Sequence, residues 1–147
     1  MKILIWIFIL ITPLIGVAQK RTSEQLKCFS AVKVAKKNIG HLNQSEISNL
    51  LYTFAPPCSN DAEFSESNSD ILFLVIEKQP SLFLKTLEND SLINIERVMG
   101  AIQYPLHSPN IISTYKSVIS DSSVSKYKQN VIKMLELAAV EVGQKIK

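Results

Sequence analysis

Apolar residues in residues 22–39 recur with the period of an α-helix. The positions that share one stripe at 100° per residue are Cys28, Val32, Ala35 and Ile39. This pattern is typical of a helix that packs one side against a core. Gly40 suits the C-cap, because glycine readily adopts the left-handed backbone conformation that ends many helices. Residues 22–39 are therefore predicted to form the first helix.

A second helix is predicted at residues 44–55. Asn43 and Glu46 have the spacing of a capping box, and Pro56 marks the end because proline cannot continue a helix. The inward positions would be Ile47, Leu50, Leu51 and Phe54. Together with the first helix, this segment would form an antiparallel hairpin joined by a short turn.

The middle of the chain changes from polar to strongly apolar. Residues 56–69 form the longest polar segment, which predicts a surface loop. Residues 71–76 are six apolar residues without a polar break, a run that suits either a buried strand or a buried helix. Because the chain offers no evident second strand to pair with it, we expect a short, fully buried helix.

Three further helices are expected to begin near Pro80, Ser91 and Ser108, because proline suits a first helical turn and serine is a common N-cap. For the first of these helices the apolar positions are Leu82, Leu84 and Leu87. For the second and third, the inward positions would be Leu92, Ile95, Val98, Met99 and Ile102, and then Ile112, Tyr115, Val118 and Ile119.

The last and longest helix is predicted at about residues 123–142. Its main stripe would hold Val124, Tyr127, Val131, Met134, Leu135, Ala138 and Val142. Ile132, Leu137 and Val140 fall outside this stripe, which indicates either a central helix covered on two sides or a dimer seam. We favour the central helix, since a helix that is apolar on most sides is usually buried. Six or seven helices predict an all-α fold, either a compact bundle or a short stack of helix pairs.

The N-terminus has the pattern of an export signal. Lys2 precedes an apolar run over residues 3–11, and small residues before Ala18 predict cleavage between Ala18 and Gln19. A retained anchor is disfavoured, because the apolar residues 3–15 are too few to cross roughly 30 Å of hydrocarbon. We expect residues 1–18 to be a cleaved signal peptide and residues 19–147 to be a single helical domain in the periplasm or secreted.

An exported protein with two cysteines usually pairs them, because no glutathione pool keeps them reduced. In the predicted hairpin, the helical segment that follows Cys28 and the one that precedes Cys58 have equal lengths, so the two cysteines would lie side by side at the same end of the hairpin. We therefore predict a Cys28–Cys58 disulfide. A catalytic or metal-binding thiol is disfavoured, since the chain has no C-x-x-C motif.

Charge is unevenly distributed along a chain whose net charge is +3. Residues 19–40 carry six basic residues and one acidic residue, whereas residues 41–100 carry three basic and nine acidic. The basic residues are Lys20, Arg21, Lys27, Lys33, Lys36 and Lys37, of which Lys27, Lys33, Lys36 and Lys37 form the candidate binding face. This face is either a solvated helix surface or a docking surface for an anionic partner. Nucleic acid is disfavoured, because no aromatic residues are interleaved among the basic ones.

No motif identifies a catalytic or metal site. The acidic residues of the polar segment fail the EF-hand pattern, since the required glycine and glutamate positions hold Glu66 and Leu72. His41 and His107 lie at no telling distance from a nucleophile, and they are expected at a helix end and in a turn. We predict no enzyme activity, no cofactor and no metal.

The leading functional hypothesis is a small exported protein that binds another protein, as an inhibitor, an immunity-type protein or an envelope adaptor. The partner would have an acidic surface if the basic face is the contact. The alternatives are a membrane-surface, lipid or small-ligand binder that uses the basic first helix, and an enzyme of unrecognised class. The oligomeric state is not predicted.

Overall fold

The computed structural model of the chain describes residues 23–60 and 62–146. The predicted signal peptide, its cleavage site, Lys20 and Arg21 lie outside these residues. The helices in chain order are α1 (Ser23–Lys37), α2 (Gln44–Tyr52), the short 3-10 helix η1 (Cys58–Asn60), α3 (Ala62–Lys78), α4 (Pro80–Asn89), α5 (Ile95–Gln103), α6 (Ile111–Ser120) and α7 (Lys128–Glu141). The described residues include no strand, so the all-α prediction is confirmed.

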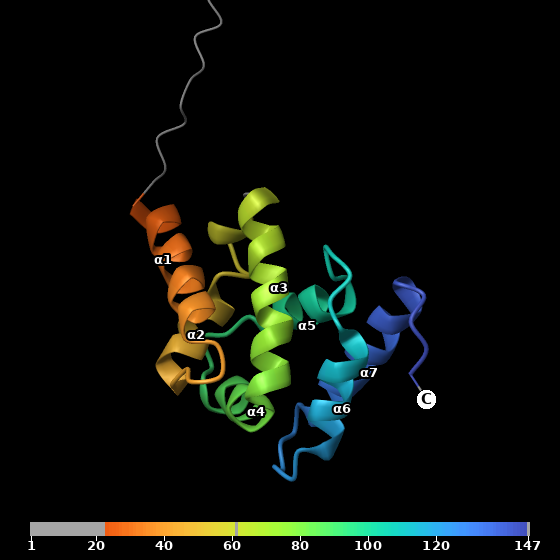
Figure 1. Ribbon diagram of the computed structural model, residues 1–147. Helices are drawn as coiled ribbons and strands as arrows, with labels where there is room; N and C mark the ends of the chain where they lie inside the picture. The colour runs from red at the N-terminus through yellow and green to blue at the C-terminus, as the bar shows by residue number, and fades with distance from the viewer. Residues whose placement is uncertain (1–22, 61, 147) are drawn as a thin grey trace, which may run out of the picture.

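The longest helix, α3, has a central position in the molecule (Figure 1). It packs against α1, α2, α4, α5 and α6, while α7 packs on α5 and α6 at the end opposite α1. Buried apolar residues from all seven α-helices belong to one continuous core. The fold is therefore a compact assembly around α3.

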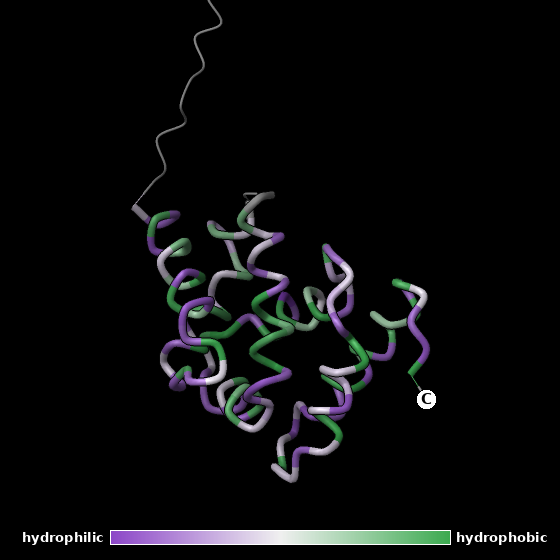
Figure 2. Tube along the Cα trace, viewed as in Figure 1, coloured by the Kyte–Doolittle hydropathy of each residue, from purple (hydrophilic) through white to green (hydrophobic). Residues whose placement is uncertain are grey.

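The prediction of a surface loop at residues 56–69 is wrong in its second half, because α3 begins at Ala62. Figure 2 shows the change from a polar to an apolar composition within this one helix. Phe64, Asn68 and Ile71 are four and three residues apart, and all three are buried. They extend the inward stripe of the apolar run into the polar segment. Composition alone indicated a loop, whereas this spacing indicates a helix.

The apolar run at residues 71–76 is helical, as predicted, but it is neither a short helix nor fully buried. It forms part of α3, and Leu74 is 40% exposed. A helix turns its side chains through all directions, so even an unbroken apolar run places one residue at the surface when the helix has a solvent side.

Two predicted helix starts are wrong by a few residues. Asn94 caps α5 by accepting a hydrogen bond from the Arg97 amide, and Asn110 caps α6 by accepting one from the Ser113 amide. The expected caps, Ser91 and Ser108, lie in the preceding connections. Some of the predicted inward positions are also wrong. Leu92, at 79%, and Ile119, at 47%, are exposed, while Ile111, Thr114 and Val118 are buried in α6.

The last helix is shorter and less central than expected. It begins at Lys128, so Val124 precedes it and is 98% exposed. Val131, Leu135 and Ala138 are buried as predicted, but Val140 is exposed and Ile132 is half-buried. Since α7 packs on α5 and α6 at one end of the molecule, the prediction of a central helix is wrong.

Candidate binding groove between the first two helices

The first two helices form the predicted hairpin, and the chain reverses direction through residues 38–43 (Figure 1). Gly40 has φ +86°, a conformation that glycine adopts without strain. Asn43 and Glu46 form the predicted capping box at the start of α2. The turn is also fixed from outside, because the Gln79 side chain exchanges two hydrogen bonds, of 3.0 and 2.8 Å, with the Leu42 backbone.

The predicted Cys28–Cys58 disulfide is present, with the two Cα atoms 5.7 Å apart. It joins α1 to η1, the segment that leads into α3. Because both cysteines of the chain are in this bond, neither is a free thiol. The disulfide therefore fixes the N-terminal half of α1 against the far end of the hairpin.

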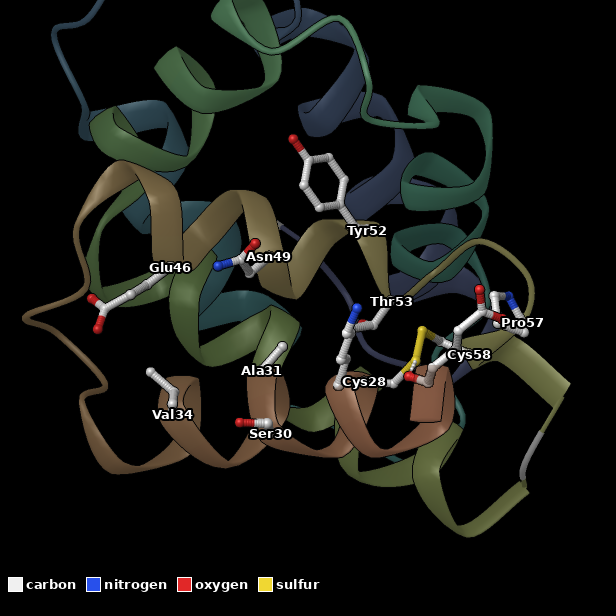
Figure 3. Close-up of a pocket in the computed structure, with 12 residues that line it drawn as sticks. Cys28, Ser30, Ala31, Val34, Glu46, Asn49, Tyr52, Thr53, Pro57 and Cys58 are labelled. Carbon is white, nitrogen blue, oxygen red and sulfur yellow. Dashed lines mark hydrogen bonds between the residues drawn. A yellow bond between two sulfur atoms is a disulfide. The ribbon is translucent and has the colours of Figure 1, made fainter. Parts of the chain in front are cut away.

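A groove of about 550 Å³ runs between α1 and α2 and ends at the disulfide (Figure 3). Its lining residues are Glu24, Lys27, Cys28, Ser30, Ala31 and Val34 from α1, Glu46, Asn49 and Tyr52 from α2, and Thr53, Pro57 and Cys58 from the segment after α2. Cys28 and Thr53 are buried at its base, and Ala31 points from α1 toward α2 (Figure 3). Glu24, Lys27 and Asn49 are exposed along its edges. The groove thus combines an apolar interior with polar edges.

Two of the polar groups along α2 are already engaged within the protein. The Glu46 carboxylate accepts hydrogen bonds from the Asn43 amide at 2.9 Å and from the Asn38 side chain at 3.2 Å. The Tyr52 hydroxyl donates a 2.5 Å hydrogen bond to Asp90, and its ring extends away from α1 (Figure 3). Glu24, Lys27 and Asn49 are therefore the edge residues better placed to contact a ligand.

The Tyr52–Asp90 pair changes the acidity of both groups. The hydrogen bond to Asp90, followed by burial, raises the pKa of Tyr52. Hydrogen bonds from Ser48 and from Tyr52 stabilise the carboxylate and lower the pKa of Asp90. Tyr52 is therefore a neutral hydrogen-bond donor at neutral pH, and Asp90 is a carboxylate.

The structure disperses the four lysines of the predicted binding face around α1. All four are exposed, but only Lys27 lines the groove. Lys27 and Lys36 are separated by about two and a half helical turns, so they lie on opposite sides of α1. The lysines therefore make the whole exposed side of α1 basic, and they converge on no single point.

The two histidines lie apart from the groove. His41 is exposed in the turn after Gly40. His107 lies in the connection between α5 and α6, where its Nδ1 is 3.3 Å from the Asp70 carboxylate and its Nε2 is 3.7 Å from Glu66. In the described part of the chain, no group of three or more histidine, cysteine, aspartate or glutamate side chains is arranged to hold a metal ion.

Within residues 23–60 and 62–146, no helix has both the length and the apolar character needed to span a bilayer. Comparison of the chain with models of protein families, with curated proteins and with solved structures finds no match. The groove and its surroundings are therefore the basis for a functional proposal.

Sequence reasoning found Lys27 and the disulfide but missed the rest of the groove. Lys27, Ala31 and Val34 have the spacing of one helical stripe, which lies beside the core stripe of α1. Val34 is 37% exposed there, although its residue type suggests burial. The sequence signal for the groove was that the apolar side of α1 is wider than packing against the core requires. Asn49 and Thr53 line the groove because of the way α2 packs against α1, and this packing cannot be predicted from a local sequence pattern.

Proposed function

We propose that this protein is exported and binds another protein, and that the groove between α1 and α2 receives an extended acidic segment of that partner. The observation that carries the proposal is the groove itself, an apolar hollow of about 550 Å³ whose α1 edge bears Lys27. The disulfide is compatible with work outside the cytoplasm, where such bonds persist.

The groove suits a peptide segment for two reasons. Its interior, around Ala31 and Val34, can bury an apolar side chain, which is the main source of favourable binding energy at such sites. Lys27 at the edge favours a carboxylate next to that side chain, on the side away from Glu24, which lies one helical turn earlier on the same edge. The other lysines of α1 create a positive field that speeds the approach of an acidic partner without contacting it.

A photo-crosslinking residue at position 49 tests the proposal in the compartment where the protein resides. Asn49 lies at the edge of the groove, and we expect it to crosslink one partner through an acidic segment. The matched control is position 85, because Lys85 is exposed on α4 and does not line the groove. Equal crosslinking of many proteins from both positions would contradict the proposal.

The crosslinked segment, made as a synthetic peptide, then allows a comparison within α1. Lys27→Glu and Lys36→Glu make the same charge change on opposite sides of the helix. We expect Lys27→Glu to weaken binding about tenfold or more, since it places a like charge beside the peptide. Lys36→Glu should change only the long-range field and weaken binding a few-fold at low salt. Equal losses would show that binding follows net charge and would exclude the groove.

One observation favours a second candidate, a membrane-surface binder. Leu26 is 56% exposed, and it shares a helical stripe with Lys33 and Lys37 on the outer side of α1. Helices that lie on anionic lipid surfaces combine exposed apolar residues with lysines. Co-sedimentation with vesicles of anionic and of neutral lipids separates the candidates, because only the membrane reading requires tighter binding to the anionic vesicles and its loss in Leu26→Ser.

A further inference from the structure

The outward side of α7 carries apolar residues as well as the inward side. The inward side is buried where α7 packs on α5 and α6, through Val131, Leu135 and Ala138. The outward side carries Leu137 and Val140, which are neighbours on the helix surface because they are three residues apart. Both are exposed, and Val140 is 76% exposed. Burying this pair against another molecule would remove apolar surface from water, which is favourable.

Two charged residues flank the apolar pair at equal distances from Leu137. Lys133 precedes Leu137 by four residues and Glu141 follows it by four, so the three residues lie along one side of the helix. Both charged residues are exposed, and neither forms a salt bridge within residues 23–60 and 62–146. This outward face of α7 therefore has a positive end, an apolar middle and a negative end.

The other two charged residues of α7 already have partners within the protein. Glu136 accepts a 3.3 Å hydrogen bond from the Tyr115 hydroxyl of α6, and the Lys128 ammonium donates one to the Asp121 carbonyl. Lys133 and Glu141 are thus the charged residues of α7 for which a partner outside the chain would matter most.

The order of residues on this face is self-complementary. If two copies of α7 lie antiparallel with their Leu137 residues in contact, each residue is level with the one at the same distance on the other side of Leu137. Lys133 of one copy is then level with Glu141 of the other, and this pairing occurs twice. Val140 is level with Met134, which is half-buried and apolar. A parallel pair would bring like charges together, so charge favours the antiparallel arrangement.

We propose that the outward face of α7 binds a second copy of this chain, in an antiparallel helix pair with a two-fold axis at Leu137. A two-fold contact uses the same surface on both copies, which requires a self-complementary surface of this kind. Because α7 lies at the end of the molecule opposite α1, the groove between α1 and α2 stays accessible in each copy (Figure 1). The proposal does not rest on the proposed function.

The size of the face limits the strength of this contact. The helix α7 has 14 residues and is therefore about 21 Å long. One such helix face against another buries less than the roughly 1,200 Å² at which stable protein–protein interfaces begin. We therefore expect a weak dimer, with a Kd of about 100 μM.

Sedimentation equilibrium of the protein with its disulfide intact, at low salt and up to about 1 mM, tests the proposal through charge reversal. Lys133→Glu and Glu141→Lys each place two pairs of like charges in the contact, so each should weaken dimerisation about three- to tenfold. The double variant restores opposite charges and should dimerise within about twofold of the native protein. A double variant as weak as the single ones would overturn the proposal. So would a native protein that stays monomeric at about 1 mM, which would leave the face to a different molecule.

Cysteine crosslinking tests the position of the two-fold axis. Leu137→Cys places one thiol from each copy at the axis, so oxidised glutathione should join the two copies there through a disulfide. Gln129→Cys is the matched control, because Gln129 is exposed on the same helix but is eight residues from the axis. Its two copies would be about 24 Å apart, too far for a disulfide. Equal crosslinking at the two positions would overturn the proposed arrangement.

Discussion

At the scale of single residues, several polar groups form hydrogen bonds with elements that are distant in sequence. Tyr52 and Asp90 belong to the ends of α2 and α4, and Gln79 holds the backbone of Leu42. Neither partner of these pairs is marked by a local sequence motif. The sequence shows that these side chains are polar, but their hydrogen-bond partners depend on which helix ends lie next to each other in the fold. These contacts were therefore not predictable from the sequence.

The Tyr52–Asp90 hydrogen bond gives a pH-dependent prediction. Tyr52→Phe removes the donor, and the free energy of unfolding at pH 7 should fall by about 0.5–1 kcal/mol. The lowered pKa of Asp90 means that its contribution is present above the usual carboxyl pKa and is lost as the pH falls through the lower, folded-state pKa. The deficit of Tyr52→Phe should therefore shrink below about pH 4.

Urea denaturation of the native protein and of Tyr52→Phe at pH 7 and pH 3 measures this deficit. Tyr104→Phe is the control, because Tyr104 is exposed and its hydroxyl accepts a hydrogen bond from the neighbouring Gln103 side chain. A deficit of Tyr52→Phe that stays the same at both pH values would show that the carboxylate is not the group that matters.

At the scale of elements, the structure shows which of two candidate residues caps a helix, a choice that the sequence pattern did not decide. Ser108 and Asn110 are both good N-cap residues on either side of Pro109, and only Asn110 accepts the hydrogen bond from Ser113, at 3.0 Å. Asn110→Ala should lower the free energy of unfolding by about 1 kcal/mol. Ser108→Ala should have almost no effect. Chemical denaturation of the two variants measures the difference, and equal effects would move the start of α6 back toward Ser108.

Local sequence signals were also insufficient for α3, where the sequence prediction was least accurate. The order and type of the other helices followed from apolar spacing, capping residues and prolines, all of which are local signals. The N-terminal half of α3 is polar, and its helical conformation depends on burying Phe64, Asn68 and Ser69 against neighbouring elements. Asn68 is stabilised there by its hydrogen bond to Thr53, fifteen residues away.

At the scale of the whole molecule, the disulfide should matter unequally to the two ends of the fold. Cys28 and Cys58 are separated by 30 positions, and closing a loop of this size destabilises the unfolded chain by about 3–4 kcal/mol. Removing the bond affects α1 most directly, because Cys28 lies on α1 and is itself one of the three α1 residues in the buried core, with Val32 and Ala35. The helices α5 and α6 both pack on α7, which lies at the end of the molecule opposite α1.

Reduction followed by alkylation should therefore have two effects. The free energy of unfolding should fall by about 3 kcal/mol, and hydrogen exchange in α1 should accelerate more than in α5, α6 and α7 under native conditions. Because α1 forms one side of the groove, binding of the acidic peptide should weaken when the disulfide is reduced. Equal acceleration of exchange in all helices would show instead that the molecule opens only as one cooperative unit.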